Sequence, residues 1–147
     1  MIRRTFDAAE VNRIANDRSV LPFIAIADSG PLDFGMWLSD AHNVALMTEG
    51  GCFLLAWVDG TTYEAHPMFV EGARGPHVLA AAREGLAWMF ARDCTEIIAP
   101  APERNRRARA LAVRLGMTFR ELAVLSNFPF SPFLMFHLTR SEFFKVT

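Results

Sequence analysis

Three consecutive apolar runs, separated only by short turn signals, constrain this chain more than any other feature. The run at 43–49 ends at a Gly-Gly pair, and the run at 52–58 ends at an Asp-Gly pair that is typical of a tight hairpin. A third run covers residues 61–70, and Pro67 within it predicts a bulge or an unpaired backbone position. Since successive hairpins join antiparallel neighbours, the runs predict a three-stranded meander.

Outside this meander, the apolar pattern predicts helices that alternate with strands. Residues 94–100 are interpreted as a buried strand parallel to the strand at 61–70, because a helix at 76–91 separates the two. Gly116 closes a second helix at 105–115. The other predicted elements are strands at 2–6, 117–125 and 133–139, a helix that Asp7 caps and that runs through residue 15, a loop or short helix at 19–27, and a helical turn or two at 31–38. This order predicts an α/β fold: a mixed, mostly antiparallel sheet flanked by helices.

The length of 147 residues suits a single domain covering 1–147, and no linker, repeat or low-complexity tract divides the chain. No apolar run reaches the roughly 18 residues that a membrane-spanning helix needs. The first residues, M-I-R-R-T-F-D, lack the apolar centre of a signal peptide. We therefore expect a cytoplasmic protein without a membrane partner.

Charge and cysteine usage exclude several classes of partner. The formal net charge of −1 provides no field that would attract nucleic acid. Cys52 and Cys94 lie far apart and form no C-x-x-C pair, so we interpret them as reduced core thiols. The histidines are scattered without the spacing of a metal site, and no metal is expected.

The stretch V-E-G-A-R-G-P-H-V-L at 70–79 joins the third strand of the meander to the helix at 76–91. The helix begins without a capping Ser, Thr, Asp or Asn, so its first N–H groups are available to an anion brought from outside. The alternative is an ordinary strand-to-helix turn, which is the more frequent use of such a sequence.

The order of elements and two motifs together resemble the GNAT family, the Gcn5-related N-acetyltransferases. The first motif is R-G-P-H-V-L at 74–79, which is similar to the family signature Gln/Arg-x-x-Gly-x-Gly/Ala in a degenerate form. The second is N-R-R-A-R-A-L-A-V-R-L-G-M-T-F at 105–119, which follows the pattern Asn-x-x-Ala-x-x-Leu-Tyr-x-x-x-Gly-Phe. Within the family, R-R-T-F-D-A-A-E-V-N-R-I-A-N-D, E-G-A-R-G and A-W-M-F most resemble small GNAT-like proteins of tailed bacteriophages.

The resemblance implies a splayed pair of parallel strands that receives acetyl-CoA as co-substrate. The pyrophosphate would be held by backbone N–H groups between Ala73 and Leu79, other than that of Pro76, and the N–H of Val70 would polarise the thioester. The residues implied in cofactor binding are Phe69, Val70, Ala73, Arg74, Gly75, His77, Val78, Leu79 and Asn105. His77 adds bulk where the family has glycine.

Two side chains are candidates for the base that removes a proton from the amine. Glu64 and His66 alternate along one strand and therefore share a face, with Glu64 as the first candidate and His66 as the second. The alternative is that both line a solvated face. The tyrosine that often protonates the departing thiolate in the family is Ala112 here, and alanine cannot donate a proton.

The sequence thus supports two hypotheses. The first is an acetyl-CoA-dependent N-acetyltransferase that moves the acetyl group directly to an amine. The second is a catalytically silent GNAT-like phage protein with a structural or virion-assembly role. The degenerate first motif and Ala112 in place of the tyrosine favour this second hypothesis. The aromatic segment at 128–136 would, if exposed, mark a contact in a homodimer or with a phage protein partner, although burial is the more frequent explanation.

Overall fold

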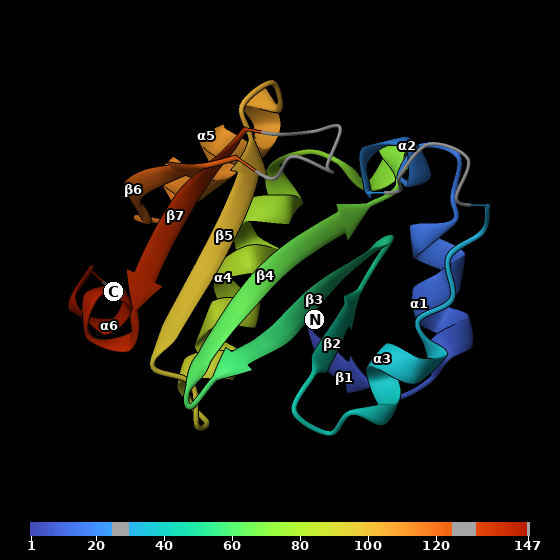
Figure 1. The fold of residues 1–147 in the computed structure, drawn as a ribbon, viewed down its shortest axis with the longest axis horizontal. Coiled ribbons are helices and arrows are strands. Elements are labelled where there is room, and N and C mark those ends of the chain that lie inside the picture. The colour runs from blue at the N-terminus through green and yellow to red at the C-terminus, as the bar shows by residue number, and fades with distance from the viewer. Residues whose placement is uncertain (25–29, 125–131, 147) are drawn as a thin grey trace.

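The computed structural model describes residues 1–24, 30–124 and 132–146 (Figure 1). The strands are β1 (Arg3–Thr5), β2 (Val44–Thr48), β3 (Gly51–Asp59), β4 (Thr62–Phe69), β5 (Glu96–Pro102), β6 (Thr118–Ala123) and β7 (Phe133–Thr139). The helices are α1 (Ala8–Ala15), α2 (Leu21–Ile24), α3 (Gly35–Ser39), the 3-10 turn η1 (Glu71–Ala73), α4 (Pro76–Phe90), α5 (Arg106–Arg114) and α6 (Arg140–Val146).

The strands form one sheet in the order β1-β2-β3-β4-β5-β7-β6. The meander of β2, β3 and β4 is confirmed, with every neighbour antiparallel. Among the strands of the described residues, only β4 and β5 run parallel, as the helix between them requires. The predicted fold class, a mostly antiparallel sheet with one parallel pair between helices, is therefore confirmed.

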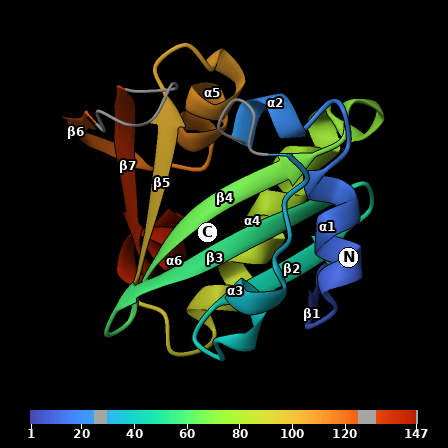
Figure 2. The ribbon, with the colours of Figure 1, turned by 45° about the vertical axis from the view of Figure 1, so that its right-hand side comes forward.

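The parallel pair stays together over three residues and then separates. Its register runs from Thr62 opposite Glu96 to Glu64 opposite Ile98. Beyond that point β4 continues to pair with β3, whereas β5 continues to pair with β7. We call the space between residues 65–69 of β4 and residues 99–102 of β5 the wedge; Figures 1 and 2 show the two strands diverging there.

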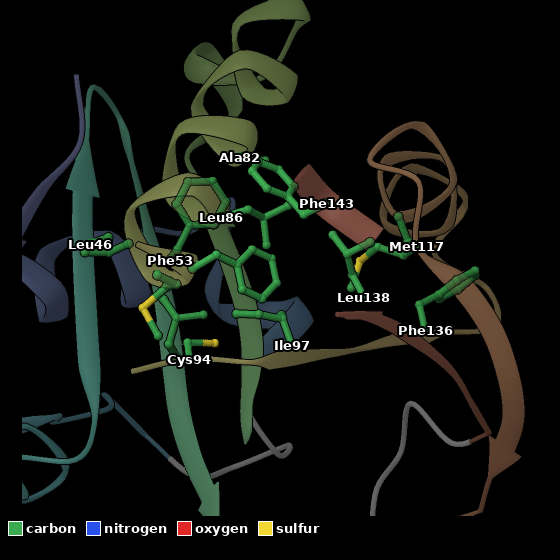
Figure 3. Packing of buried hydrophobic residues seen from close by; sticks show 14 of the residues in the cluster. Leu46, Phe53, Ala82, Leu86, Cys94, Ile97, Met117, Phe136, Leu138 and Phe143 are labelled. Atoms are coloured by element: carbon green, nitrogen blue, oxygen red, sulfur yellow. The ribbon is translucent and has the colours of Figure 1, made fainter. Parts of the chain in front are cut away.

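Helices cover the two faces of the sheet, each above its own hydrophobic core. On one face, α1 and α3 bury Val11 and Leu38 against β2, β3 and the Met68 side chain of β4. On the other face, α4 lies along the sheet and buries Leu86 against Phe53, in the core that Figure 3 shows. Packing on both faces leaves the parted ends of β4 and β5 supported from either side.

Local signals account for most element ends. The Asp7 side chain accepts the N–H of Ala9 at 2.9 Å and so caps α1, as predicted. Gly116 follows α5 with φ +82°, the left-handed conformation that glycine adopts at helix ends. The two cysteines are free and buried, as predicted, and burial raises the pKa of Cys52 to about 12.

Some expectations need correction or fall outside the structure. Of the two alternatives predicted for Pro67, the bulge is not observed: Pro67 sits opposite Phe53 in regular register, and the irregularity in this hairpin lies between Trp57 and Asp59. Helix α6 was not expected at all. Residues 25–27 of the segment predicted at 19–27, and residues 128–131 of the segment at 128–136, lie outside the described residues. No helix in the described ranges is both long and apolar enough to cross a membrane.

Candidate functional site at the parted strands

The connection at 70–75, which leads from β4 into α4, rests on the turn between β2 and β3. The N–H of Val70 donates to the carbonyl oxygen of Gly50 at 3.0 Å. Gly50 has φ +67°, and a Cβ placed on it would lie 2.3 Å from the Cβ of Ala73. Glycine at this turn therefore permits both the backbone conformation and the close seating of the connection.

Arg74 holds the same connection from the other side. Its Nε donates to the carbonyl oxygen of Phe69 at 3.1 Å, and its Nη2 donates to the carbonyl oxygen of Ser19 at 2.6 Å. The Ser19 hydroxyl in turn accepts the N–H of Glu71 at 2.9 Å. The guanidinium that the sequence suggested for phosphate binding is thus engaged in fixing the backbone that surrounds it.

The backbone N–H groups of the connection divide into engaged and free donors. Those of Ala73, Arg74 and Val78 donate to carbonyl oxygens within the connection. Within the described residues, those of Gly75 and His77 have no protein acceptor, whereas Leu79 is the fourth residue of α4 and its N–H belongs to the hydrogen-bond ladder of the helix. The free N–H groups gather at the N-terminus of α4, where the helix dipole adds partial positive charge. This end of the helix can therefore accept a phosphate group.

Gly75 is the N-cap of α4, and its backbone has φ +151°. This conformation is strained for any residue with a side chain, which explains the glycine directly before Pro76. His77 is exposed, and its ring centroid lies 6.4 Å from that of Phe69. The imidazole thus lies at the outer end of the wedge, beside the free N–H groups.

The edge of β4 that faces the wedge carries few donors. Because Val70 and Gly50 form a hydrogen-bonded pair, the next residue, Phe69, directs its N–H and carbonyl away from β3. Arg74 reaches the Phe69 carbonyl from that side. The N–H of Val70, expected to polarise a thioester, is therefore engaged, and Phe69 provides the N–H that faces the wedge. Pro67, two residues earlier, faces the same way and has no N–H.

Glu64 and His66 form one unit on the face opposite α4. The Nε2 atom of His66 lies 2.8 Å from Oε1 of Glu64, and the side chains are 43% and 34% exposed, respectively. The hydrogen bond from His66 lowers the pKa of Glu64 below its usual value, against an opposing effect of burial. Glu64 lies in the last residue pair before β4 and β5 separate. A carboxylate and an imidazole thus stand together at the apex of the wedge.

Asn105 is the N-cap of α5 and lies just beyond the end of β5. Its side-chain oxygen accepts the N–H of Ala108 at 3.1 Å, and its own N–H donates to the carbonyl oxygen of Pro102 at 2.9 Å. These bonds fix the start of α5 beside the wedge. The role of the Asn105 side chain in these contacts is to cap helix α5.

A cavity of about 70 Å³ lies behind the wedge, between the sheet and helices α4 and α5. Ala65, Pro67, Ala99 and Ala112 are among its lining residues, and no lining residue has a polar side chain. Ala112, at the position of the family tyrosine, is 4% exposed. A proton donor from α5 is therefore missing where the two strands part.

One residue of this site escaped the sequence reasoning, and another was recognised only in part. Ser19 holds the connection through its carbonyl and hydroxyl oxygens, but it lies 55 residues from Arg74 and carries no local signal. Pro67 in a strand-like run already predicted an irregular or unpaired position. That its backbone faces the wedge follows only from its register with β3. Among the described residues, no group of three or more His, Cys, Asp or Glu side chains is placed to hold a metal ion.

Solved structures share this architecture, although no protein-family model and no curated protein matches the sequence. Spermidine N-acetyltransferase from Vibrio cholerae in complex with CoA and spermine has a TM-score of 0.77 and 13% identity, over 98% of this chain and 97% of that chain. A proposed acetyltransferase from Acinetobacter baylyi has a TM-score of 0.74 and 16% identity, over 95% and 93% of the two chains. A proposed acetyltransferase from Salmonella typhimurium with its cofactor acetyl-CoA has a TM-score of 0.69 and 18% identity, also over 95% and 93%.

These likenesses extend over nearly the whole of each chain. At such low identity they show a shared fold, and the fold that they show is that of the GNAT acetyltransferases. They are likenesses to bacterial proteins and lend no support to the narrower resemblance to phage proteins.

Proposed function

We propose that this chain is an acetyl-CoA-dependent N-acetyltransferase that transfers the acetyl group directly to an amine. The single observation that carries the proposal is the wedge between β4 and β5, with two free N–H groups at its outer end and a carboxylate–imidazole pair at its apex. The solved structures with acetyl-CoA or with CoA and spermine support it, because they share the fold.

The residues present suit a nucleotide thioester. Its pyrophosphate would meet the N–H groups of Gly75 and His77 at the positive end of α4. The pantetheine arm would lie in the wedge beside the Phe69 backbone. Arg74 would not contact the phosphates directly. Its hydrogen bonds to the carbonyl oxygens of Phe69 and Ser19 would instead hold the backbone beneath them in place.

When bound, the thioester supplies an electrophilic carbonyl carbon, at which the amine nitrogen forms the new C–N bond while the C–S bond breaks and its electrons remain on sulfur. The Glu64–His66 pair removes the proton that the amine must lose, with Glu64 as the first candidate for the base. The lowered pKa of Glu64 keeps the carboxylate ionised at neutral pH. The thiolate takes its proton from water, because Ala112 has none to give.

A second candidate function is favoured by Pro67 and Ala112. The first removes an N–H from the wedge edge of β4, and the second removes the phenol from α5. Both losses reduce stabilisation of a developing oxyanion or thiolate. The alternative is a silent GNAT-like protein with a structural or assembly role, such as a tailed-phage component that contacts a second copy or another phage protein.

Acetyl-CoA binding and turnover separate the two candidates. We expect millimolar acetyl-CoA to raise the melting temperature, since a ligand of the native state stabilises it. With a panel of primary amines, free CoA should then be released and detected by a thiol reagent, to which the two buried cysteines of the native chain contribute little. Binding without CoA release from any amine would favour the silent alternative, and absence of binding would overturn the acetyltransferase proposal.

A further inference from the structure

The cavity behind the wedge is larger and more apolar than an acetyl group requires. It measures about 70 Å³, and every residue that lines it has an apolar side chain or none. An apolar cavity of this kind stays dry, since the side chains that line it offer water no hydrogen-bonding partner. The natural occupant is therefore an apolar group that enters with a ligand.

The position of the cavity connects it to the proposed reaction. Ala65 and Ala99 line it, and they directly follow Glu64 and Ile98, the last parallel pair. Side chains alternate along a strand, so the cavity opens on the face opposite Glu64. An acyl group whose carbonyl lies between the parted strands, within reach of an amine beside Glu64, can extend its chain into this space.

Both helices above the cavity present small residues to it. Ala112 of α5 leaves free the space that a larger side chain would fill, and it is 4% exposed. Gly85 of α4 also lines the cavity, and a Cβ added to it would lie 3.7 Å from the nearest atom, in the Phe53 ring. A glycine in the middle of a helix costs roughly 0.5–1 kcal/mol relative to alanine, so this opening carries a cost in stability.

We propose that the acyl donor of this chain carries a short, unbranched apolar chain with about three carbons beyond the carbonyl, as in butyryl-CoA. The inference rests on the proposed function and specifies its acyl group. A dry cavity of roughly 150 Å³ holds the six carbons of benzene, so about half that volume holds about three. Chains that end in a carboxylate, such as succinyl, are excluded because the cavity has no polar side chain to receive the charge.

Calorimetric titration of the whole chain with CoA, acetyl-CoA, butyryl-CoA and succinyl-CoA tests this inference. Two further buried methylenes at about 0.8 kcal/mol each correspond to roughly 15-fold tighter binding of butyryl-CoA than of acetyl-CoA. Succinyl-CoA should bind more weakly than butyryl-CoA. If CoA and acetyl-CoA bind but butyryl-CoA binds no more tightly, the inference is overturned while the proposed function stands. If none of the four binds, both are overturned.

A pair of variants in neighbouring positions locates the effect. Ala112→Leu fills the cavity and should reduce the butyryl-to-acetyl preference to about onefold, whereas Val113→Leu, at a residue that is 63% exposed, should retain it. A preference that survives Ala112→Leu in a folded protein would show that the chain binds elsewhere. The wild-type ligand series decides the question even if Ala112→Leu does not fold.

Discussion

Arg74 and Ser19, which lie 55 residues apart in the sequence, meet at 2.6 Å where the guanidinium Nη2 donates to the Ser19 carbonyl oxygen. This contact joins the segment after α1 to the connection that leads into α4. The same guanidinium holds the Phe69 carbonyl at the end of β4. The backbone geometry of the proposed phosphate site is therefore set by a residue that does not itself face the phosphate.

Replacement of Arg74 should loosen this connection. Hydrogen bonds to charged groups contribute about 1.5–3 kcal/mol, so Arg74→Ala should lower the free energy of unfolding by about that amount. It should also weaken CoA binding, because the free N–H groups lose their fixed arrangement. Arg18→Ala, at an exposed arginine next to Ser19, is the control in the same denaturation and titration experiments. Equal effects of the two substitutions would contradict the role assigned to Arg74.

Two glycines should respond in opposite directions to alanine. Gly85→Ala should raise the free energy of unfolding by about 0.5–1 kcal/mol, because the new methyl meets its nearest atom at an ordinary 3.7 Å. Gly51→Ala should lower it by about 1–3 kcal/mol, because the new Cβ would lie 2.3 Å from the Phe69 ring. Urea denaturation of both variants measures the difference, and a Gly51→Ala protein as stable as wild type would contradict the packing described for β3 and β4.

Glu64→Gln should separate catalysis from binding. General base catalysis contributes about 10²–10⁴-fold, so kcat should fall within that range while the Kd for CoA changes less than about twofold. Glu121→Gln, at an exposed position of β6, is the matched control. A kcat unchanged by Glu64→Gln would exclude Glu64 as the base and leave His66 as the candidate.

Glu10 should make the native state sensitive to acid. Hydrogen bonds from Arg3 and then Thr5 lower its pKa from 4.5 to about 2. A carboxyl whose pKa is lower in the folded state stabilises that state above its unfolded pKa. Its contribution should thus be complete above about pH 4.5 and disappear as the pH falls toward 2. Glu10→Gln should remove this part of the pH dependence in denaturation experiments, whereas Glu49→Gln, at an exposed residue, should preserve it.

The sequence was sufficient for most of the fold because the relevant signals are local. Asp7 caps α1, the Asp-Gly pair turns β3 into β4, and the helix between β4 and β5 makes them parallel. Helix α6 was missed although Thr139 and Glu142 form a capping box, in which each side chain accepts the other's backbone N–H, at 3.2 and 2.9 Å. That motif was visible in the sequence as T-R-S-E, but the helix after it has only seven residues.

The site was harder to predict from the sequence than the fold, because its geometry depends on strand register and on contacts between residues far apart in the chain. The sequence placed Arg74, Gly75 and the start of α4 together, and it placed Glu64 and His66 on one face. It did not show which N–H groups are free, since the N–H of Val70 is engaged by Gly50, in the turn between β2 and β3. The wedge-facing direction of Phe69 and Pro67 follows from the pairing of β4 with β3, which no local pattern reveals.

A crystal structure of the chain with bound CoA tests the central claim most directly. The account predicts a pyrophosphate whose oxygens accept hydrogen bonds from the N–H groups of Gly75 and His77, at about 2.7–3.2 Å, with the pantetheine arm between β4 and β5. CoA bound outside the wedge, with these two N–H groups directed to solvent, would contradict it.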